Sequence, residues 1–198
     1  MTTDSRERMI RAAVELFAER GYAATSFHDI IERSGAPRGS IYHHFPGGKA
    51  ELAGEALRRA AERTARHLTT ASTQGSPITA VRVFVTALSE ALRASDFHAG
   101  CAIAGVVLDT TPADEALLRQ SAAAFARWRQ ALTHGFRRAG ATPTEARRLA
   151  VFVVAAVEGA LLLARAERNL QPLTDVGREL EAHVRAVLGR PHRPTSSR

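Results

Sequence analysis

The chain has 198 residues, which is enough for one domain, or two small ones, with a buried core. It is 45% hydrophobic and 24% charged, as globular proteins are, and its single cysteine excludes an intrachain disulfide and fits a reducing compartment. The net charge of +7 is weak evidence for a nucleic-acid partner, because residues 1–50 carry seven basic and six acidic side chains.

The first fifty residues predict short helices separated by tight turns. Apolar residues recur at helical spacing over residues 10–17, and Gly21 follows as a helix stop. A second helix is predicted to begin at Ser26, which approximates a capping box with Asp29, and to end at residues 34–35.

A third and very short helix is predicted over residues 37–44, in the stretch PRGSIYHHFPGGK. Ile41 and Phe45 are four residues apart and are expected to face inward, against the first two helices. So short a helix buries little surface, so its outward residues need another reason to exist. They are Arg38, Gly39, Ser40, Tyr42 and His43.

The rest of the chain predicts longer helices. One is expected from Lys49 to about Leu68, followed by a loop over residues 69–77. The pairs Ser76-Pro77, Thr111-Pro112 and Thr142-Pro143 each provide a cap and a first-turn proline for a later helix. The total is about nine helices without strand signals, so the expected fold class is all-α; residues 97–109 are the least regular segment.

Two helices joined by a Ser-Gly-Ala-Pro turn indicate a helix-turn-helix. Arg38 can fork onto guanine or phosphate, and Gly39 lets the backbone approach base edges. Tyr42 and His43 offer flat rings with polar tips. Lys49 adds charge where helical backbone amides already suit phosphate. The sequence therefore predicts a surface that docks onto DNA.

The stretch MIRAAVELFAERGYAATSFHDIIERSGAPRGSIYHHFPGGKAEL resembles the N-terminal DNA-binding domain of TetR-family transcriptional regulators. The likeness covers residues 6–65, and its G-x-x-x-G-[ST]-[IL]-Y-x-H-F core is highly specific. Two departures are Pro37, where the family more often has Ser or Thr, and the turn PGGK, which is one residue longer than the commoner PSK. The resemblance implies a DNA-contact set of Thr25, Ser26, Arg38, Gly39, Ser40, Tyr42, His43 and Lys49.

Residues 100–109 (GCAIAGVVLD) and 158–169 (EGALLLARAERN) are similar to a subgroup that resembles bacterial lincomycin-resistance repressors. This implies a homodimeric repressor of drug-efflux or stress genes, released from its operator by a small hydrophobic molecule and needing no cofactor. The expected domains are a helix-turn-helix domain at 1–65, a ligand-binding and dimerisation domain at 66–189 and a basic, disordered tail at 190–198.

Helically spaced aromatic residues are by default core, but the resemblance points to a ligand cavity among them. The predicted pocket residues are Phe84, Leu88, Phe97, Ile103, Val107, Phe125, Trp128, Leu132 and Phe152. His98, His134 and Glu158 are polar groups that could orient a ligand. The alternative for Glu158 is an ion pair with an arginine near the end of its helix.

Residues 149–164 are apolar nearly all round, which fits either a fully buried helix or a dimer interface. A two-fold four-helix interface also explains the apolar stripe on the last helix. The predicted interface residues are Phe152, Ala156, Gly159, Ala160, Leu163, Val176, Leu180 and Val184.

Other readings of single motifs are less favoured. A metal site at His43-His44 is disfavoured because adjacent helical residues diverge by about a hundred degrees. Cys101 fits a small core residue better than a redox sensor. The carboxylates Asp109, Asp114 and Glu115 are expected at a helix start, where they complement the helix dipole.

The sequence contains no motif of an enzyme active site, so we expect no catalytic activity. The start MTTDSRER lacks an apolar core, and the apolar stretch 149–164 is shorter than the ~20 residues of a membrane span, so we expect a soluble cytoplasmic protein. Two rivals remain: a ligand-blind architectural DNA-binding protein, which would have a solid core near Trp128, and a binding or catalytic protein that has lost its DNA function.

Overall fold

The computed structural model describes residues 2–189, and the basic tail expected at 190–198 lies outside them. The described residues form an all-α fold with the predicted number of helices and no strand, which confirms the expected fold class. The helices are α1 (Thr2–Arg20), α2 (Phe27–Ser34), α3 (Ser40–His44), α4 (Gly48–Gln74), α5 (Pro77–Ala94), α6 (Ala102–Asp109), α7 (Glu115–Arg138), α8 (Pro143–Glu167) and α9 (Gln171–Leu188).

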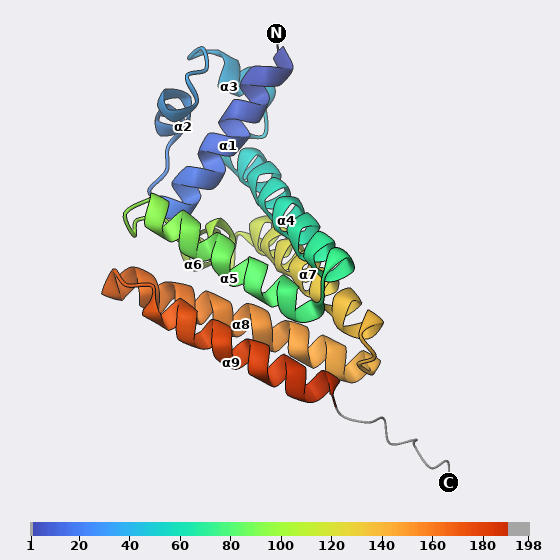
Figure 1. The fold of residues 1–198 in the computed structure, drawn as a ribbon. Helices are drawn as coiled ribbons and strands as arrows, with labels where there is room; N and C mark the ends of the chain where they lie inside the picture. Colours follow the sequence, from blue (N-terminus) through green and yellow to red (C-terminus); the bar gives the residue numbers. More distant parts are fainter. Residues whose placement is uncertain (1, 190–198) are drawn as a thin grey trace.

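Helices α1 to α3 form a small unit at one end of the molecule, here called the headpiece (Figure 1). Ser26 caps α2 in a complete capping box with Asp29, and Gly35 ends α2 in the left-handed region at φ +62°. Ile41 and Phe45 are fully buried, so the inward face predicted for the third helix is confirmed. Helix α3 itself begins only at Ser40, because residues 37–39 form a turn rather than a first helical turn.

Helix α4 leaves the headpiece and continues for 27 residues along the remainder of the molecule, here called the body (Figure 1). It extends six residues beyond the predicted end at Leu68, through the segment expected to be a loop. Leu68 is fully buried, and no glycine or proline interrupts the chain before Gly75. Tertiary packing therefore carries the helix past its threonine-rich end.

Helices α8 and α9 lie side by side at the opposite end from the headpiece, next to α5 (Figure 1). Val153 and Val157 of α8 are fully buried in the core that α8 shares with α7 and α9. Within the described residues, α8 is the one helix that is long and apolar enough to span a membrane by length and composition, with 44% of its most apolar window buried. It is longer than the apolar stretch seen in the sequence, and it packs as a core helix.

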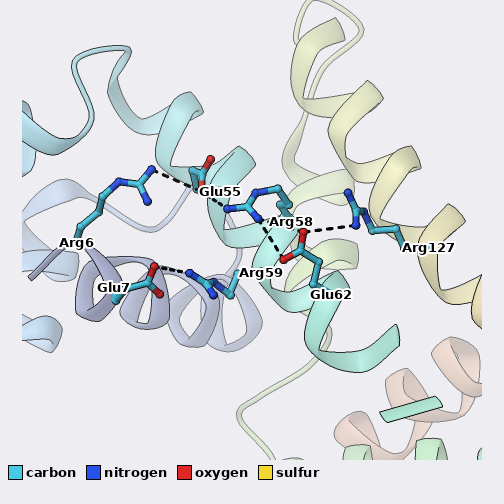
Figure 2. A network of polar contacts seen from close by, with 7 residues as sticks. All are labelled: Arg6, Glu7, Glu55, Arg58, Arg59, Glu62 and Arg127. Carbon is cyan, nitrogen blue, oxygen red and sulfur yellow. Dashed lines mark hydrogen bonds and ion pairs between the residues drawn. The ribbon is translucent and has the colours of Figure 1, made fainter. Parts of the chain in front are cut away.

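Ion pairs join α1, α4 and α7 along one side of the molecule (Figure 2). Arg58 of α4 bridges Glu55 at 2.7 Å and Glu62 at 3.1 Å on its own helix. From these carboxylates the network reaches Arg6 of α1 at 3.5 Å and Arg127 of α7 at 3.4 Å. All the members are partly exposed, so each pair contributes at most about 1 kcal/mol, and the main effect is to fix the angle between helices.

Candidate nucleic-acid interface

The turn before α3 and the helix itself present their predicted outward residues to solvent. Arg38, Gly39 and His43 are exposed, and Tyr42 is 68% exposed. A Cβ added at Gly39 would meet no atom within 4 Å, so the backbone there is open to an approaching surface. A large exposed aromatic on so short a helix is unexplained by packing within the chain.

Tyr42 is held in position by a neighbour that the sequence did not single out for this role. The ring of Phe27, at the start of α2, meets the Tyr42 ring edge-on with centroids 5.5 Å apart. Phe27 is half-buried. No spacing rule links these two positions, because the contact depends on how α2 and α3 cross.

Two of the hydroxyls predicted to contact DNA serve the backbone instead. Thr25 is buried, and its hydroxyl donates to the carbonyl oxygen of Gly21 at 2.7 Å, which closes the turn between α1 and α2. Its side chain is therefore not offered to DNA. The half-buried Ser40 donates its hydroxyl to the carbonyl oxygen of Pro37 at 2.6 Å. Its oxygen keeps acceptor capacity only.

Ser26 is exposed and is the N-terminal cap of α2. Its oxygen accepts a hydrogen bond from the backbone N–H of Asp29 at 3.2 Å, and its own N–H donates to the Asp29 carboxylate at 2.7 Å. The Ser26 hydroxyl also donates to the Asp29 carboxylate at 2.6 Å, and this hydrogen bond, with the one from the Ser26 N–H, lowers the pKa of Asp29. Arg20 lies 3.2 Å from the same carboxylate. These contacts fix the orientation of the Ser26 and Asp29 side chains at the start of α2.

Lys49 lies against the turn between α1 and α2. Its Nζ is 4.2 Å from the centre of the Tyr22 ring and 3.5 Å from the carbonyl oxygen of Ala23. Burial lowers its pKa, although Asp109 and Asp29 oppose the shift. The lysine therefore holds the start of α4 against this turn, and its side chain is only partly exposed to solvent.

The two adjacent histidines have different surroundings. His44 Nε2 shares a hydrogen bond of 3.0 Å with the hydroxyl of Ser5, so His44 anchors the end of α3 to α1. His43 is exposed, and the two rings are 5.4 Å apart and inclined at 63°. Among the described residues no group of three His, Cys, Asp or Glu side chains could hold a metal ion.

A large, mainly apolar cavity of about 810 Å³ opens in the body, with walls from α1, α4, α5, α6 and α7. Four of the predicted pocket residues line it: Phe84, Leu88, Ile103 and Trp128. Five do not. Leu132 is buried in the core, Phe125 packs its ring on Trp128, Phe97 lies under Arg168, Val107 is half-buried on α6, and Phe152 is exposed on the outer face of α8.

The walls of this cavity are mainly apolar but include polar groups. The Nε1 of Trp128 is buried with no hydrogen-bond partner, and Thr64 and His67 add polar atoms from α4. Four charged side chains also line it: Glu15, Glu19, Arg63 and Glu90. The predicted polar groups are placed elsewhere: His98 and His134 are exposed outside the cavity walls, and Glu158 lines a separate, smaller cavity. Among the described residues, Glu158 makes no ion pair with an arginine, in contrast to the alternative considered from the sequence.

The predicted dimer residues fall into two groups. Phe152, Gly159 and Leu163 are exposed on one side of α8. Ala160, Leu180 and Val184 are buried within the chain's own core, and Ala156 and Val176 pack half-buried against it. The stripe on α9 faces α5 and α8, because a single amphipathic face can be satisfied by the body as well as by a second copy.

Cys101 precedes α6 as its N-terminal cap, and its Sγ accepts a hydrogen bond from the N–H of Ala104 at 3.5 Å. Burial, with the nearby carboxyl of Glu158, raises the pKa of the Cys101 thiol well above its ordinary value. A thiol held in its protonated form is a poor nucleophile, which agrees with the prediction that Cys101 is a small core residue and not a redox sensor. Asp109, expected at a helix start, instead ends α6 and accepts a hydrogen bond from the Ala23 N–H at 2.9 Å.

A headpiece with an exposed, ring-bearing third helix, joined by one long helix to a helical body, defines a helix-turn-helix DNA-binding regulator. Residues 9–56 match the model of bacterial regulatory proteins of the tetR family. Residues 77–179 match the model of the transcriptional regulator LmrA/YxaF-like C-terminal domain.

Relatives and solved structures agree with these matches. The uncharacterized HTH-type transcriptional regulator Rv0196 of Mycobacterium tuberculosis (strain ATCC 25618 / H37Rv) is 37% identical, over 92% of this chain and 95% of its own length. The HTH-type transcriptional regulator LmrA of Bacillus subtilis (strain 168) is 30% identical over 87% and 93%. A TetR transcriptional regulator from Legionella pneumophila shares the fold with a TM-score of 0.79, at 24% identity over 89% and 95%.

The chain belongs to the TetR family of bacterial transcriptional regulators. It is therefore a DNA-binding regulator and not an enzyme, as the sequence predicted. A cysteine mutant of the TetR-family regulator CifR, complexed with 26-bp double-strand operator DNA, has the same fold with a TM-score of 0.73, at 21% identity over 89% of this chain and 94% of that one.

Proposed function

We propose that the chain is a cytoplasmic, homodimeric repressor that a small hydrophobic molecule releases from its operator. The observation that carries the proposal is the cavity of about 810 Å³, because its walls include α1 of the headpiece as well as helices of the body. A molecule bound there touches α1, which packs on α2 and α3 of the headpiece, and it touches α5 and α7, which pack on α8.

The exposed face of α8 supports a second copy as the partner. Val151, Phe152, Leu162 and Leu163 are between 43% and 58% exposed, and the exposed Gly159 lies between them. Helices with an apolar exposed stripe and a small residue at its centre pack closely against each other. Two copies joined there would present their α3 helices to half-sites about 34–36 Å, or a multiple of that, apart.

The proposed division of labour follows from these surfaces. Residues 1–65 read DNA and residues 66–189 hold the second copy, while the effector cavity takes its walls from both parts, and α4 is continuous across position 65. The effector must bind the released form more tightly than the DNA-bound form, since equal binding to both would shift nothing. Drug-efflux or stress genes are the proposed targets, as the resemblance of residues 100–109 and 158–169 to lincomycin-resistance repressors implies.

The cavity beside Trp128 speaks against a ligand-blind architectural protein, for which we expected a solid core at this position. Trp128 is the one tryptophan of the chain, so its fluorescence reports on this cavity without a label. Hydrophobic compounds can therefore be screened by the change in tryptophan emission. Those that change it are then tested for release of the chain's own upstream DNA by fluorescence anisotropy.

The decisive variant is Ala91→Phe, which fills the cavity from α5. We expect it to bind upstream DNA normally and to lose at least about 10-fold in affinity for compounds that quench Trp128. Ala123→Phe, at an exposed position of α7 outside the cavity, is the matched control and keeps the response. Release of DNA that is equal in both variants would contradict the proposed effector site.

A further inference from the structure

A second, smaller cavity of about 240 Å³ lies between α1, α6 and α8, at the joint of headpiece and body. It shares the residues Ala18, Gly100 and Cys101 with the larger cavity and is otherwise lined by different side chains. Leu108 and Leu162, which are 74% and 58% exposed, give it an apolar rim. The volume suits a molecule of one ring with a short substituent.

The carboxyl group of Glu158 lies on the wall of this cavity. Its Oε1 is buried and has no hydrogen-bond partner, and its neighbour is the Cys101 thiol. A buried acceptor without a donor costs free energy, and native structures seldom leave one without a reason. A donor from outside the chain would relieve that cost.

The other charged groups on the wall already have partners. Arg165 donates to the carbonyl oxygen of Glu19 at 2.6 Å, Arg20 lies 3.2 Å from the Asp29 carboxylate, and Asp109 accepts from the Ala23 N–H at 2.9 Å. Burial raises the pKa of Glu158 to about 7, and the Cys101 thiol beside the carboxyl group partly offsets this rise. Of the two carboxyl groups among the described residues that line the cavity, Asp109 has a backbone donor, whereas the Oε1 of Glu158 has none.

We propose that this cavity is a second ligand site, which binds a small organic cation through Glu158. The ammonium group of the ligand donates to Oε1 of Glu158, and its apolar part packs on Leu108 and Leu162. This site is distinct from the hydrophobic effector cavity and does not depend on it.

The position of the site gives its occupant a direct route to the headpiece. The N–H of Gly100 donates to the carbonyl oxygen of Ala18 in α1 at 2.7 Å, and a Cβ added at Gly105 would lie 2.5 Å from the carbonyl oxygen of Phe17. At these two glycines, the start of α6 and the segment before it pack directly against the backbone of α1. A ligand between them that favours one spacing changes the affinity for DNA.

Benzylamine is the probe, and benzyl alcohol, with the same ring and size but no charge, is its control. Isothermal titration calorimetry on the full-length protein is expected to show benzylamine binding at least about 10-fold more tightly, because a buried charged hydrogen bond exceeds a neutral one. Affinity for benzylamine rises between about pH 6 and about pH 8, since the carboxylate of Glu158 forms as pH passes its pKa and the amine stays protonated.

Two variants test the site itself. Glu158→Gln keeps the size of the side chain and is expected to weaken benzylamine binding about 10-fold or more, to abolish its pH dependence, and to leave benzyl alcohol unchanged. Ala104→Leu fills the same cavity without altering the carboxyl group and is expected to block both probes. Glu90→Gln, which lines only the larger cavity, is the matched control and binds benzylamine normally.

The results separate this proposal from the effector site. Loss of benzylamine binding in Glu158→Gln, with the tryptophan response to hydrophobic compounds intact, supports the second site. The inference is overturned if benzylamine fails to bind, or if it binds Glu158→Gln and Glu90→Gln with equal affinity.

Discussion

Most arginines of the headpiece neutralise a carboxylate, and Arg38 does not. Arg6, Arg8, Arg20 and Arg33 each lie within 3.6 Å of an acidic side chain. Arg38 and Arg11 are exposed and make no ion pair with any described residue. Of these two, Arg38 lies in the turn before α3, close to the exposed Tyr42, so it is the free cation at the surface predicted to meet DNA.

Replacing Arg38 with alanine is expected to weaken binding to upstream DNA on the order of 10-fold, the size of one good contact. If the guanidinium meets phosphate, the slope of log affinity against log salt also falls by about 0.9 and all sequences are affected alike. If it meets guanine, the slope holds and selectivity at one base pair is lost. Fluorescence anisotropy across a salt series measures both quantities.

Arg129→Ala is the control for that measurement, because Arg129 is exposed on α7, away from the headpiece. It should change neither the affinity nor the slope. Equal losses in Arg38→Ala and Arg129→Ala would mean that the bulk charge of the chain, and not the surface of α3, drives binding.

Single-residue predictions succeeded where one type of environment was available. Ile41 and Phe45 had only an interior to occupy, and both are buried. A threonine or serine near a turn can donate to DNA or to its own backbone, and the local sequence is the same in both cases. Thr25 and Ser40 donate to the backbone.

At the scale of helices, α2 and α8 begin with the same device. Ser26 with Asp29 and Thr142 with Glu145 both form complete capping boxes. The first cap orients a helix of the headpiece, and the second starts a helix of the body. This chain therefore contains a matched pair for separating stability from DNA binding.

Ser26→Ala and Thr142→Ala are each expected to lower the free energy of unfolding by about 1 kcal/mol, because each leaves an N-terminal N–H without its acceptor. Only Ser26→Ala should also weaken DNA binding, since α2 carries Phe27, the neighbour of Tyr42. Urea denaturation and anisotropy provide the two readouts. A loss of DNA affinity in Thr142→Ala as large as in Ser26→Ala would refute this assignment.

Helix starts were easier to predict than helix ends and lengths. Caps and first-turn prolines stand in the sequence at Ser76-Pro77 and Thr142-Pro143, and both helices begin there. The same prediction at Thr111-Pro112 was wrong: the Thr111 N–H donates to the Asp114 carboxylate in a turn, and α7 begins at Glu115. The end of α4 carries no such mark until Gly75, because burial of Leu68 and contacts with neighbouring helices sustain it. The start of α3 was placed too early for the converse reason: Pro37 fits a turn as well as a first helical residue.

For the whole molecule, the proposed dimer has a direct test. Leu163→Arg places a charge in the exposed stripe of α8 and is expected to raise the dimer dissociation constant on the order of 100-fold. DNA affinity falls with it, because a single headpiece holds one half-site only. Sedimentation velocity over a concentration series measures the first effect and anisotropy the second.

Ala123→Arg is the control, since Ala123 is exposed on α7, outside the stripe and outside both cavities. It should leave the dimer intact. Dissociation of both variants at the same concentration would show that the charge alone, and not its place on α8, disrupts the assembly.

The fold and the family could be predicted from the sequence, whereas the cavities could not. Trp128 and Leu132 are one turn apart, so their spacing predicts that both line the cavity. The cavity is formed by the packing of five helices, and spacing along one helix does not show which residue reaches it. Trp128 lines it and Leu132 is buried in the core. The α9 stripe was uncertain for a similar reason, because α5 and α8 supplied the apolar surface that a second copy might equally have provided.

Helix α4 has a mechanical consequence that follows from its length alone. With 27 residues it is a rod of about 40 Å, fixed to α7 and α5 along the body and to the headpiece at its first turns. Pivoting such a rod by about 3° displaces its far end by about 2 Å, and in the proposed two-fold dimer the change in distance between the two headpieces would be twice as large. A rearrangement of less than an ångström around a cavity is thereby amplified, so that the two α3 helices of the proposed dimer no longer fit consecutive turns of the DNA.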